Sequence, residues 1–240
     1  MNVEGRNAVR EVINSDKTVD KILVQNGLRD EQSRTLINAI KESGVKFSFA
    51  EKAVLDKMSN TGKHQGFIAV LSEYTYCEIE DIIDACVKTQ KPVVILDGIE
   101  DAHNLGSIIR TCECGGVSGI IIGKHRQAPV SDTVIRISEG SATHVKIARV
   151  TNVNNAIKQI KQNNIFVFSL ELGGSSIYKS NLTGLTAIVV GGEDTGVNSL
   201  TKKLSDGVIT IPMEGKVNSL NASVACGVAV FEALRQRSKL

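Results

Sequence analysis

Over the first 75 residues, short apolar runs alternate with amphipathic helical patterns. Each run is brief and rich in β-branched or aromatic residues, so it predicts a strand, whereas apolar positions three and four apart predict helices. The predicted strands are 21–24, 47–49 and 66–71, and the predicted helices are 7–14, 29–43 and 50–58. A polar, acidic stretch follows at 72–78. We therefore expect a small α/β domain over 1–75 and a second domain over 76–240.

Apolar runs then recur at regular intervals to the end of the chain. The predicted strands are 93–96, 119–122, 145–148, 165–168, 187–190 and 208–211, and the predicted helices are 79–88, 105–114, 153–161, 199–204 and 222–237. Continuous β-branched runs that alternate with helices are typical of a parallel sheet covered on both faces. Ligands of such sheets bind beyond the carboxyl ends of the strands. The residues that follow each run are therefore the candidates for chemistry.

Composition places the chain among globular proteins, with 42% hydrophobic and 22% charged residues, and excludes disordered and fibrous classes. Its 28 basic and 26 acidic residues nearly cancel, so net charge does not identify a partner. The N-terminus has no secretory pattern and no segment resembles a membrane span, so we expect a cytoplasmic protein without a membrane partner. Five cysteines, an odd number, fit neither a disulfide framework nor a four-ligand zinc site. We expect reduced, mostly buried thiols and no metal.

A first polar cluster follows the run at 93–96. Asn104 is a candidate N-cap for the next helix, and Arg110 lies six residues further on. An arginine in a helix otherwise rich in Ile, Cys and Gly requires an anion or a carboxylate. The functional interpretation makes Arg110 a ligand of a substrate anion. The alternative is a surface arginine paired with Glu113 or Glu139.

A second cluster, with glycines at 191, 192 and 196 around Glu193, follows the run at 187–190. Such glycines allow the backbone to approach a ligand closely or to take positive φ. The spacing is not that of a dinucleotide-binding loop, and acidic residues inside the loop would repel a pyrophosphate. The alternative interpretation is a tight turn with a carboxylate at the start of the next helix.

A third cluster follows the run at 208–211. Ser219 and Asn221 offer helix caps or hydrogen bonds to a ligand, and small residues from Ala222 to Gly227 allow close approach to the helix start. Small residues on a helix more often serve close packing than ligand binding. Each cluster alone is weak, but three at the strand ends of one sheet indicate a shared pocket.

Together these stretches resemble the SpoU/TrmH family of RNA ribose 2′-O-methyltransferases, within the SPOUT class. The resemblance rests on three motifs in the family order: Asn104, Gly106 and Arg110; Gly191, Glu193 and Gly196; and Ile211, Pro212, Met213 and Gly215 followed by Ser219, Leu220, Asn221, Ser223, Val224 and Ala225. In the first domain, 5–8 (GRNA) and 64–66 (HQG) resemble the ribosomal-protein-like RNA-binding domain of members that methylate large-subunit ribosomal RNA. Two stretches depart from the family pattern, Gln127 in place of a serine and 139–143 (EGSAT).

The resemblance implies an α/β fold whose C-terminal parallel-sheet domain contains a deep trefoil knot. It implies S-adenosylmethionine bound by the knotted loops, through Gly191, Ile211 and Leu220, with Leu170 as a weaker candidate. It implies Arg110 as the leading catalytic residue, with Asn104, Glu193, Ser219 and Asn221 around it. A guanidinium is a poor base because its pKa lies far above neutral pH, so a phosphate clamp is the easier role for Arg110. Glu193 could orient Arg110 or bind the ribose.

The resemblance also implies an RNA partner and a homodimer whose interface includes the helix at 222–237. Candidate interface residues are Val224, Val228, Phe231 and Leu234, and candidate RNA contacts are Arg6, Arg10, Lys63, His64, Lys124, Arg126 and Arg136. The favoured substrate is a guanosine in large-subunit ribosomal RNA. Two alternatives remain open: the same chemistry on transfer RNA or another ribosomal nucleoside, and a non-catalytic RNA-binding factor in ribosome assembly.

Overall fold

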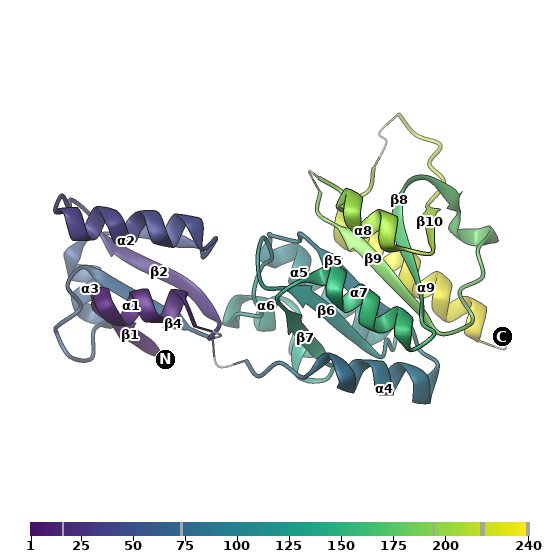
Figure 1. Cartoon of the computed structure of the whole chain (residues 1–240), viewed down its shortest axis with the longest axis horizontal. Coiled ribbons are helices and arrows are strands. Elements are labelled where there is room, and N and C mark those ends of the chain that lie inside the picture. The colour runs from purple at the N-terminus through teal and green to yellow at the C-terminus, as the bar shows by residue number, and fades with distance from the viewer. Residues whose placement is uncertain (16, 73, 194, 217–218, 239–240) are drawn as a thin grey trace. The chain divides into compact units, whose positions relative to one another are not determined.

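The computed structural model describes residues 1–15, 17–72, 74–193, 195–216 and 219–238. The chain divides into two compact units, coloured in Figure 1 from purple to yellow along the chain. The N-terminal unit comprises Met1–Thr75 and Pro129–Asp132, and the C-terminal unit comprises Tyr76–Ala128 and Thr133–Leu240. No helix in the described ranges combines the length and the apolar character needed to cross a bilayer.

The described residues of the N-terminal unit form a four-stranded sheet with three helices. Its elements are β1 (Asn2–Glu4), α1 (Arg6–Ile13), β2 (Val19–Gln25), α2 (Glu31–Glu42), β3 (Phe47–Ala50), α3 (Lys52–Met58) and β4 (Phe67–Leu71). The strand order is β1-β4-β2-β3, with β4 antiparallel to both neighbours and β3 parallel to β2. Leu36 and Ile40 of α2 pack on Ile22, Val24 and Phe67 of the sheet. The predicted helices and strands are present, and β1 is additional.

The C-terminal unit is built on a parallel sheet in the order β10-β8-β9-β5-β6-β7. The strands are β5 (Val93–Asp97), β6 (Gly119–Gly123), β7 (Ile147–Val150), β8 (Phe166–Ser176), β9 (Thr186–Gly191) and β10 (Gly207–Thr210). The helices are α4 (Ile79–Thr89), α5 (Ala102–Cys114), α6 (Asp132–Ile137), α7 (Val153–Gln162), α8 (Ser199–Leu204) and α9 (Ala222–Arg237). The predicted parallel sheet is thus confirmed.

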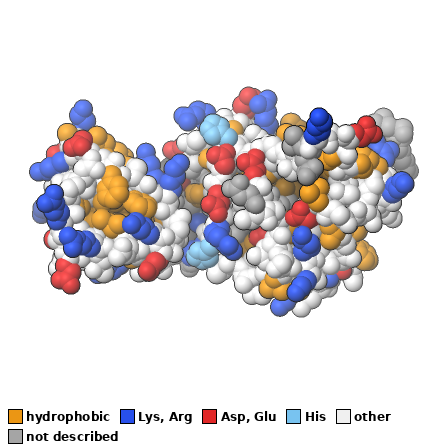
Figure 2. Space-filling model, turned by 90° about the horizontal axis from the view of Figure 1, so that it is seen from above, with side chains coloured by type: hydrophobic (Ala, Val, Ile, Leu, Met, Phe, Trp, Pro, Cys, Tyr) orange, Lys and Arg blue, Asp and Glu red, His pale blue; other side chains and the backbone are white. Residues whose placement is uncertain are grey.

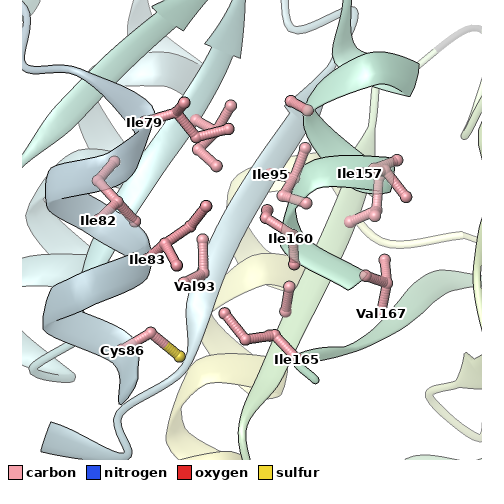
Figure 3. Close-up of a cluster of buried hydrophobic side chains, with 14 of the residues drawn as sticks. Ile79, Ile82, Ile83, Cys86, Val93, Ile95, Ile157, Ile160, Ile165 and Val167 are labelled. Atoms are coloured by element: carbon pink, nitrogen blue, oxygen red, sulfur yellow. The ribbon is translucent and has the colours of Figure 1, made fainter. Parts of the chain in front are cut away.

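Helices cover both faces of this sheet. Ile82 of α4 and Ile157 of α7 meet Val93, Ile95 and Val167 of the strands in one buried cluster (Figure 3). Figure 1 shows α7 in front of the sheet and α9 behind it. Strands β5 and β6 are buried along their length, which explains their uninterrupted β-branched sequence.

Helices α5 and α9 pack closely because a glycine and several small residues lie between them. A Cβ on Gly115 would lie 2.2 Å from Cγ1 of Val230, and a Cβ on Gly106 would lie 2.5 Å from Cγ2 of Ile137 in α6. Cys112 and Cys226 are buried thiols at the same interface. Glycine at motif position 106 is therefore explained by the packing of α5 against α6.

Two sequence predictions in this unit need correction, and one short helix was not predicted. The N-cap of α5 is Asp101, whose carboxylate accepts from the amides of His103 and Asn104, so Asn104 lies in the first turn. Strand β8 extends to Ser176 instead of ending at 168, because its polar, glycine-containing second half pairs with β10 across a register shift. Helix α6 has only six residues and gave no clear pattern.

Candidate functional site

A cavity of about 330 Å³ lies where the carboxyl ends of β8, β9 and β10 meet the start of α9. Its walls are mainly apolar and backbone surfaces. They consist of Leu170, Glu171, Leu172, Val190, Gly191, Gly192, Glu193, Thr195, Gly196, Thr210, Ile211, Met213, Ser219, Leu220, Ala222 and Ala225. This is the edge of the parallel sheet at which ligands bind. Figure 2 shows the C-terminal unit from above.

All four residues that the sequence suggested for cofactor binding line this cavity: Leu170, Gly191, Ile211 and Leu220. Leu170 lies in β8, Gly191 ends β9, and Ile211 directly follows β10. Leu220 precedes Asn221, the N-cap of α9. The cavity therefore combines four segments spread over 51 residues of sequence, from Leu170 to Leu220.

The described part of the glycine loop, residues 191–193 and 195–196, is shaped by close backbone contacts. A Cβ on Gly191 would lie 2.1 Å from the carbonyl carbon of Gly196, and one on Gly192 would lie 2.3 Å from the carbonyl oxygen of Gly98. Gly196 has a φ of +61°, which favours glycine. The amide of Gly196 donates to the carbonyl of Gly192 at 2.9 Å. The motif glycines thus fold the loop against itself and against the β5 end.

Asn221 joins two of the motifs to a third. Its Nδ2 donates to Oδ1 of Asn104 at 3.0 Å and to the carboxylate of Glu193. Its Oδ1 accepts from the amide of Ser223 at 2.9 Å and so caps α9. Three candidate catalytic residues from three separate clusters are therefore brought together by one amide side chain.

Arg110 lies on the exposed side of α5, in the third turn. Its Nη1 donates to Oε1 of Glu139 at 2.7 Å, with side chains that are 51% and 66% exposed. This is the carboxylate pairing that the alternative interpretation of the sequence anticipated. Glu139 has a φ of +49° and precedes Gly140, so a tight turn presents its carboxylate. The described side-chain hydrogen bond of Glu193 runs to Asn221.

The site residues divide by position. Glu193 and Ser219 line the cavity, whereas Asn104, Arg110 and Asn221 lie outside its lining. The described lining carries two carboxylates, Glu171 and Glu193, and no lysine, arginine or histidine. Among the described residues there is no cluster of His, Cys, Asp or Glu able to hold a metal ion.

Glu171 lines the cavity but was not predicted from the sequence. Its Oε2 accepts from the amide of Val197 at 3.1 Å, its Oε1 accepts from the amide of Leu172 at 3.0 Å, and Lys202 lies 3.7 Å away. It fixes the glycine loop at the cavity wall. The sequence does place this carboxylate three residues after the predicted strand end at 168. Because β8 was predicted too short, Glu171 was not recognised as a residue of the sheet edge.

Two residues expected to contact RNA have partners within the protein. His64 is 4% exposed, its Nδ1 accepts from the amide of Gly66 at 3.0 Å, and its Nε2 lies 2.9 Å from Asp56. Arg6 pairs with Asp30 at 3.0 Å. His64 is thus a buried turn residue. Four further candidates are exposed: Arg10, Lys63, Arg126 and Arg136.

Two family models match this chain. The SpoU rRNA methylase family model matches residues 91–231, and the model for RNA 2′-O ribose methyltransferase substrate binding matches residues 2–77. The chain belongs to the SpoU rRNA methylase family. It is an RNA methyltransferase of the SpoU/TrmH type, and the three motif clusters all lie within the methylase match.

Curated relatives match along nearly the whole chain. A Staphylococcus haemolyticus protein assigned to TrmH family tRNA/rRNA methyltransferases is 38% identical, with 99% of this chain and 96% of the relative covered. A Staphylococcus aureus protein of the same description is 37% identical, with 98% and 96% covered.

Solved structures of SpoU methyltransferases share the fold. AviRb from Streptomyces viridochromogenes, crystallised with AdoMet, has a TM-score of 0.62 at 22% identity, covering 99% of this chain and 90% of that one. A TrmH/SpoU tRNA modifying enzyme from A. aeolicus has a TM-score of 0.57 at 28% identity, covering 66% and 84%.

Proposed function

We propose that this SpoU family protein transfers a methyl group from S-adenosylmethionine to a ribose 2′-hydroxyl of RNA, with a guanosine in large-subunit ribosomal RNA as the favoured target. The observation that carries the proposal is the convergence of the second and third motifs on one cavity, with the first motif joined to them through Asn221. The chemistry needs donor and acceptor held side by side.

The cavity suits the methyl donor. Apolar walls, including Leu170, Ile211 and Leu220, fit an adenine and a thioether chain. The donor carries a sulfonium and an ammonium, and the two carboxylates of the lining complement these cations. A cofactor with phosphate groups is disfavoured, because the two carboxylates would repel it and the described lining has no basic side chain to attract it.

S-adenosylmethionine supplies an electrophilic methyl: the S–CH₃ bond breaks with its electron pair kept by sulfur, while a new bond forms to the ribose oxygen, which loses its proton. Asn104, Glu193 and Asn221 lie in one hydrogen-bonded group beside the cavity and would orient the 2′-hydroxyl. Ser219 lines the cavity and would hold the donor or the ribose. Glu193, the carboxylate of this hydrogen-bonded group, is the candidate to accept the proton.

Arg110 takes the role of a phosphate clamp. Its exposed guanidinium presents parallel N–H donors that match a phosphodiester. Glu139 holds the side chain extended before RNA arrives, and the phosphate would compete with that carboxylate. An exposed ion pair contributes at most about 1 kcal/mol, so the exchange costs little.

The N-terminal unit supports RNA as the substrate class, because it matches the substrate-binding family model. We favour large-subunit ribosomal RNA, and a guanosine within it, on the resemblance of 5–8 and 64–66 to members with that target. The names of the relatives include both tRNA and rRNA, so transfer RNA is the second candidate.

A homodimer through α9 is part of the proposal, as is a trefoil knot in the C-terminal unit. Val224, Phe231 and Leu234 are 51%, 48% and 38% exposed and share one face of α9 with Val228. Burial of these side chains against a second copy would remove a large apolar surface from water. Phe231→Glu should give a monomer in light scattering, whereas an unchanged dimer would place the interface elsewhere.

The direct test uses purified protein, labelled S-adenosylmethionine and total RNA, followed by mapping of 2′-O-methyl groups. We expect label in ribosomal RNA, at a guanosine. Arg110→Ala should lower transfer at least about 100-fold and leave donor binding unchanged, and Lys158→Ala, which removes an exposed cation on α7 away from the site, is the control. Donor binding without label in any RNA would support the non-catalytic alternative.

A further inference from the structure

A second cavity, of about 640 Å³, lies on the other side of the glycine loop. Three loops at the carboxyl ends of β5, β6 and β9 form it together with α8. Most of its lining residues carry polar or charged side chains: Asp97, Gly98, Glu100, His125, Arg126, Thr195, Gly196, Val197, Asn198, Ser199, Lys202 and Lys203. Thr195 and Gly196 line the first cavity as well, so the two cavities share a wall.

The shape of this second cavity is fixed by hydrogen bonds between its loops. The amide of Asn198 donates to Oδ2 of Asp97 at 3.0 Å. Gln127, which replaces the usual family serine, accepts from the amide of Ile99 at 3.0 Å through its Oε1. The amide of Ala128 donates to the carbonyl of Ile99 at 2.8 Å. The β5 and β6 loops are therefore tied together just beneath Arg126.

Arg126 stands in a strained position. It has a φ of +50°, which a residue with a side chain rarely adopts, and Gly98 beside it has a φ of +87°. Strained backbone of this kind gathers at ligand sites, where the surrounding structure holds it in place. Arg126 is exposed, and within the described chain it makes no ion pair. The same is true of Lys203 and His125, whereas Lys202 lies 3.7 Å from Glu171.

The charges of the lining select the kind of ligand. Arg126, Lys202 and Lys203 outnumber Asp97 and Glu100 by one, before any contribution of His125. A bare phosphate would be attracted by the cations and repelled by exposed Glu100. A nucleotide offers an anionic phosphate for the cations. It also offers hydroxyl or amino groups that can donate hydrogen bonds to a carboxylate. Figure 2 shows acidic, basic and His side chains close together on this face.

We infer that this cavity holds a nucleotide of the RNA strand next to the methylated one, with its phosphodiester on Arg126 and Lys203. This inference rests on the proposed function, because it needs RNA at the first cavity. The shared wall of Thr195 and Gly196 separates the donor from the neighbouring nucleotide, and the strand would continue from one cavity to the other. Gln127 is a positioning residue, since it holds the loop that carries Arg126.

The test compares Arg126→Gln/Lys203→Gln with Lys88→Gln/Lys158→Gln, a pair of exposed lysines on α4 and α7 that removes the same charge. All four positions are exposed, so both variants should fold. Binding of a fluorescent single-stranded RNA is measured by anisotropy at several salt concentrations. Each lost phosphate contact lowers the slope of log affinity against log salt by about 0.7, so the cavity variant should lose about 1.4 and the control much less.

In the methylation assay, the cavity variant should raise the KM for ribosomal RNA at least about tenfold and leave the affinity for S-adenosylmethionine unchanged. Equal salt slopes for the two variants would overturn the inference, even if the wild type methylates RNA. The wild type could transfer no methyl group while the cavity variant still shows the smaller salt slope. That result would refute the proposed function but retain the cavity as an RNA site. The cavity variant could instead lose binding of inorganic phosphate while its RNA binding stays unchanged. That result would identify a free-phosphate site and overturn the inference.

Discussion

Asn221 performs two tasks that substitution can separate. Its Oδ1 caps α9 through the amide of Ser223, and its Nδ2 donates to Asn104 and Glu193. Asn221→Ser keeps an oxygen that can cap the helix but removes the amide nitrogen that donates to Asn104 and Glu193. Asn221→Ala removes both. The difference between the two variants therefore measures the cap, and the difference between serine and wild type measures the link between the motifs.

The expected magnitudes follow from these contacts. Loss of an N-cap costs about 1 kcal/mol. The bond to Asn104 contributes about 0.5 kcal/mol, the lower end for a hydrogen bond, because Asn221 is exposed. The free energy of unfolding should fall by about 0.5 kcal/mol in Asn221→Ser and by about 1.5 kcal/mol in Asn221→Ala. At roughly 2–4 °C per kcal/mol, alanine should lower the Tm by about 3–6 °C and serine by less than about 2 °C.

Scanning calorimetry measures the stabilities, and methyl transfer from labelled S-adenosylmethionine to ribosomal RNA measures activity. Both variants should lose at least about tenfold in kcat, because Asn104 and Glu193 lose the amide that joins them. Full activity in the stable serine variant would show that the link has no part in the chemistry. If Asn221→Ser and Asn221→Ala lower the stability equally, the serine hydroxyl does not cap α9.

Two further predictions concern the fold. Gly115→Ala should lower the free energy of unfolding by about 1–3 kcal/mol, because a φ of −79° accepts a side chain but the new Cβ would lie 2.2 Å from Val230. Adding Val230→Ala should recover part of this loss, as measured by urea unfolding. If nothing is recovered, the strain does not come from Val230. Burial, reinforced by Asp132, raises the pKa of Asp20 from 3.8 to about 6. The folded state then binds the proton more tightly, so stability falls as pH rises from 3.8 to 6; Asp20→Asn should flatten that fall, and an unchanged pH profile would contradict the assignment.

Sequence patterns located most elements because the strands are either fully buried or bounded by polar residues. Helices α8 and α9 begin and end where predicted. The second half of β8 could not be foreseen: its polar, glycine-containing sequence has no strand pattern, and it is extended only because β10 lies beside it. The short α6 likewise depends on its packing against Gly106.

The site could be assembled from sequence only as far as the motifs reached. The cavity-lining residues Gly191, Ile211 and Leu220 were found because the family resemblance implies them by their positions in the motifs. The partner of Arg110 could not be decided, since Glu113 and Glu139 were equally plausible until the turn after α6 placed Glu139 at 2.7 Å. The capping of α5 by Asp101 was missed because Asp101 and Asn104 are both good caps three residues apart.

The two cavities carry different charges, and this difference predicts different responses to salt. The described lining of the first has two carboxylates and no basic residue, and its walls are mostly apolar. The second cavity and Arg110 present exposed cations. Phosphate contacts release counterions and weaken steeply with salt, whereas charges of a small ligand that are paired inside a mostly apolar cavity are screened much less. Raising the salt concentration should therefore increase the KM for RNA by an order of magnitude or more while the affinity for S-adenosylmethionine, followed by calorimetry, stays within about twofold. A donor affinity that fell in parallel with RNA binding would mean that the donor is held by exposed charges, outside the apolar cavity.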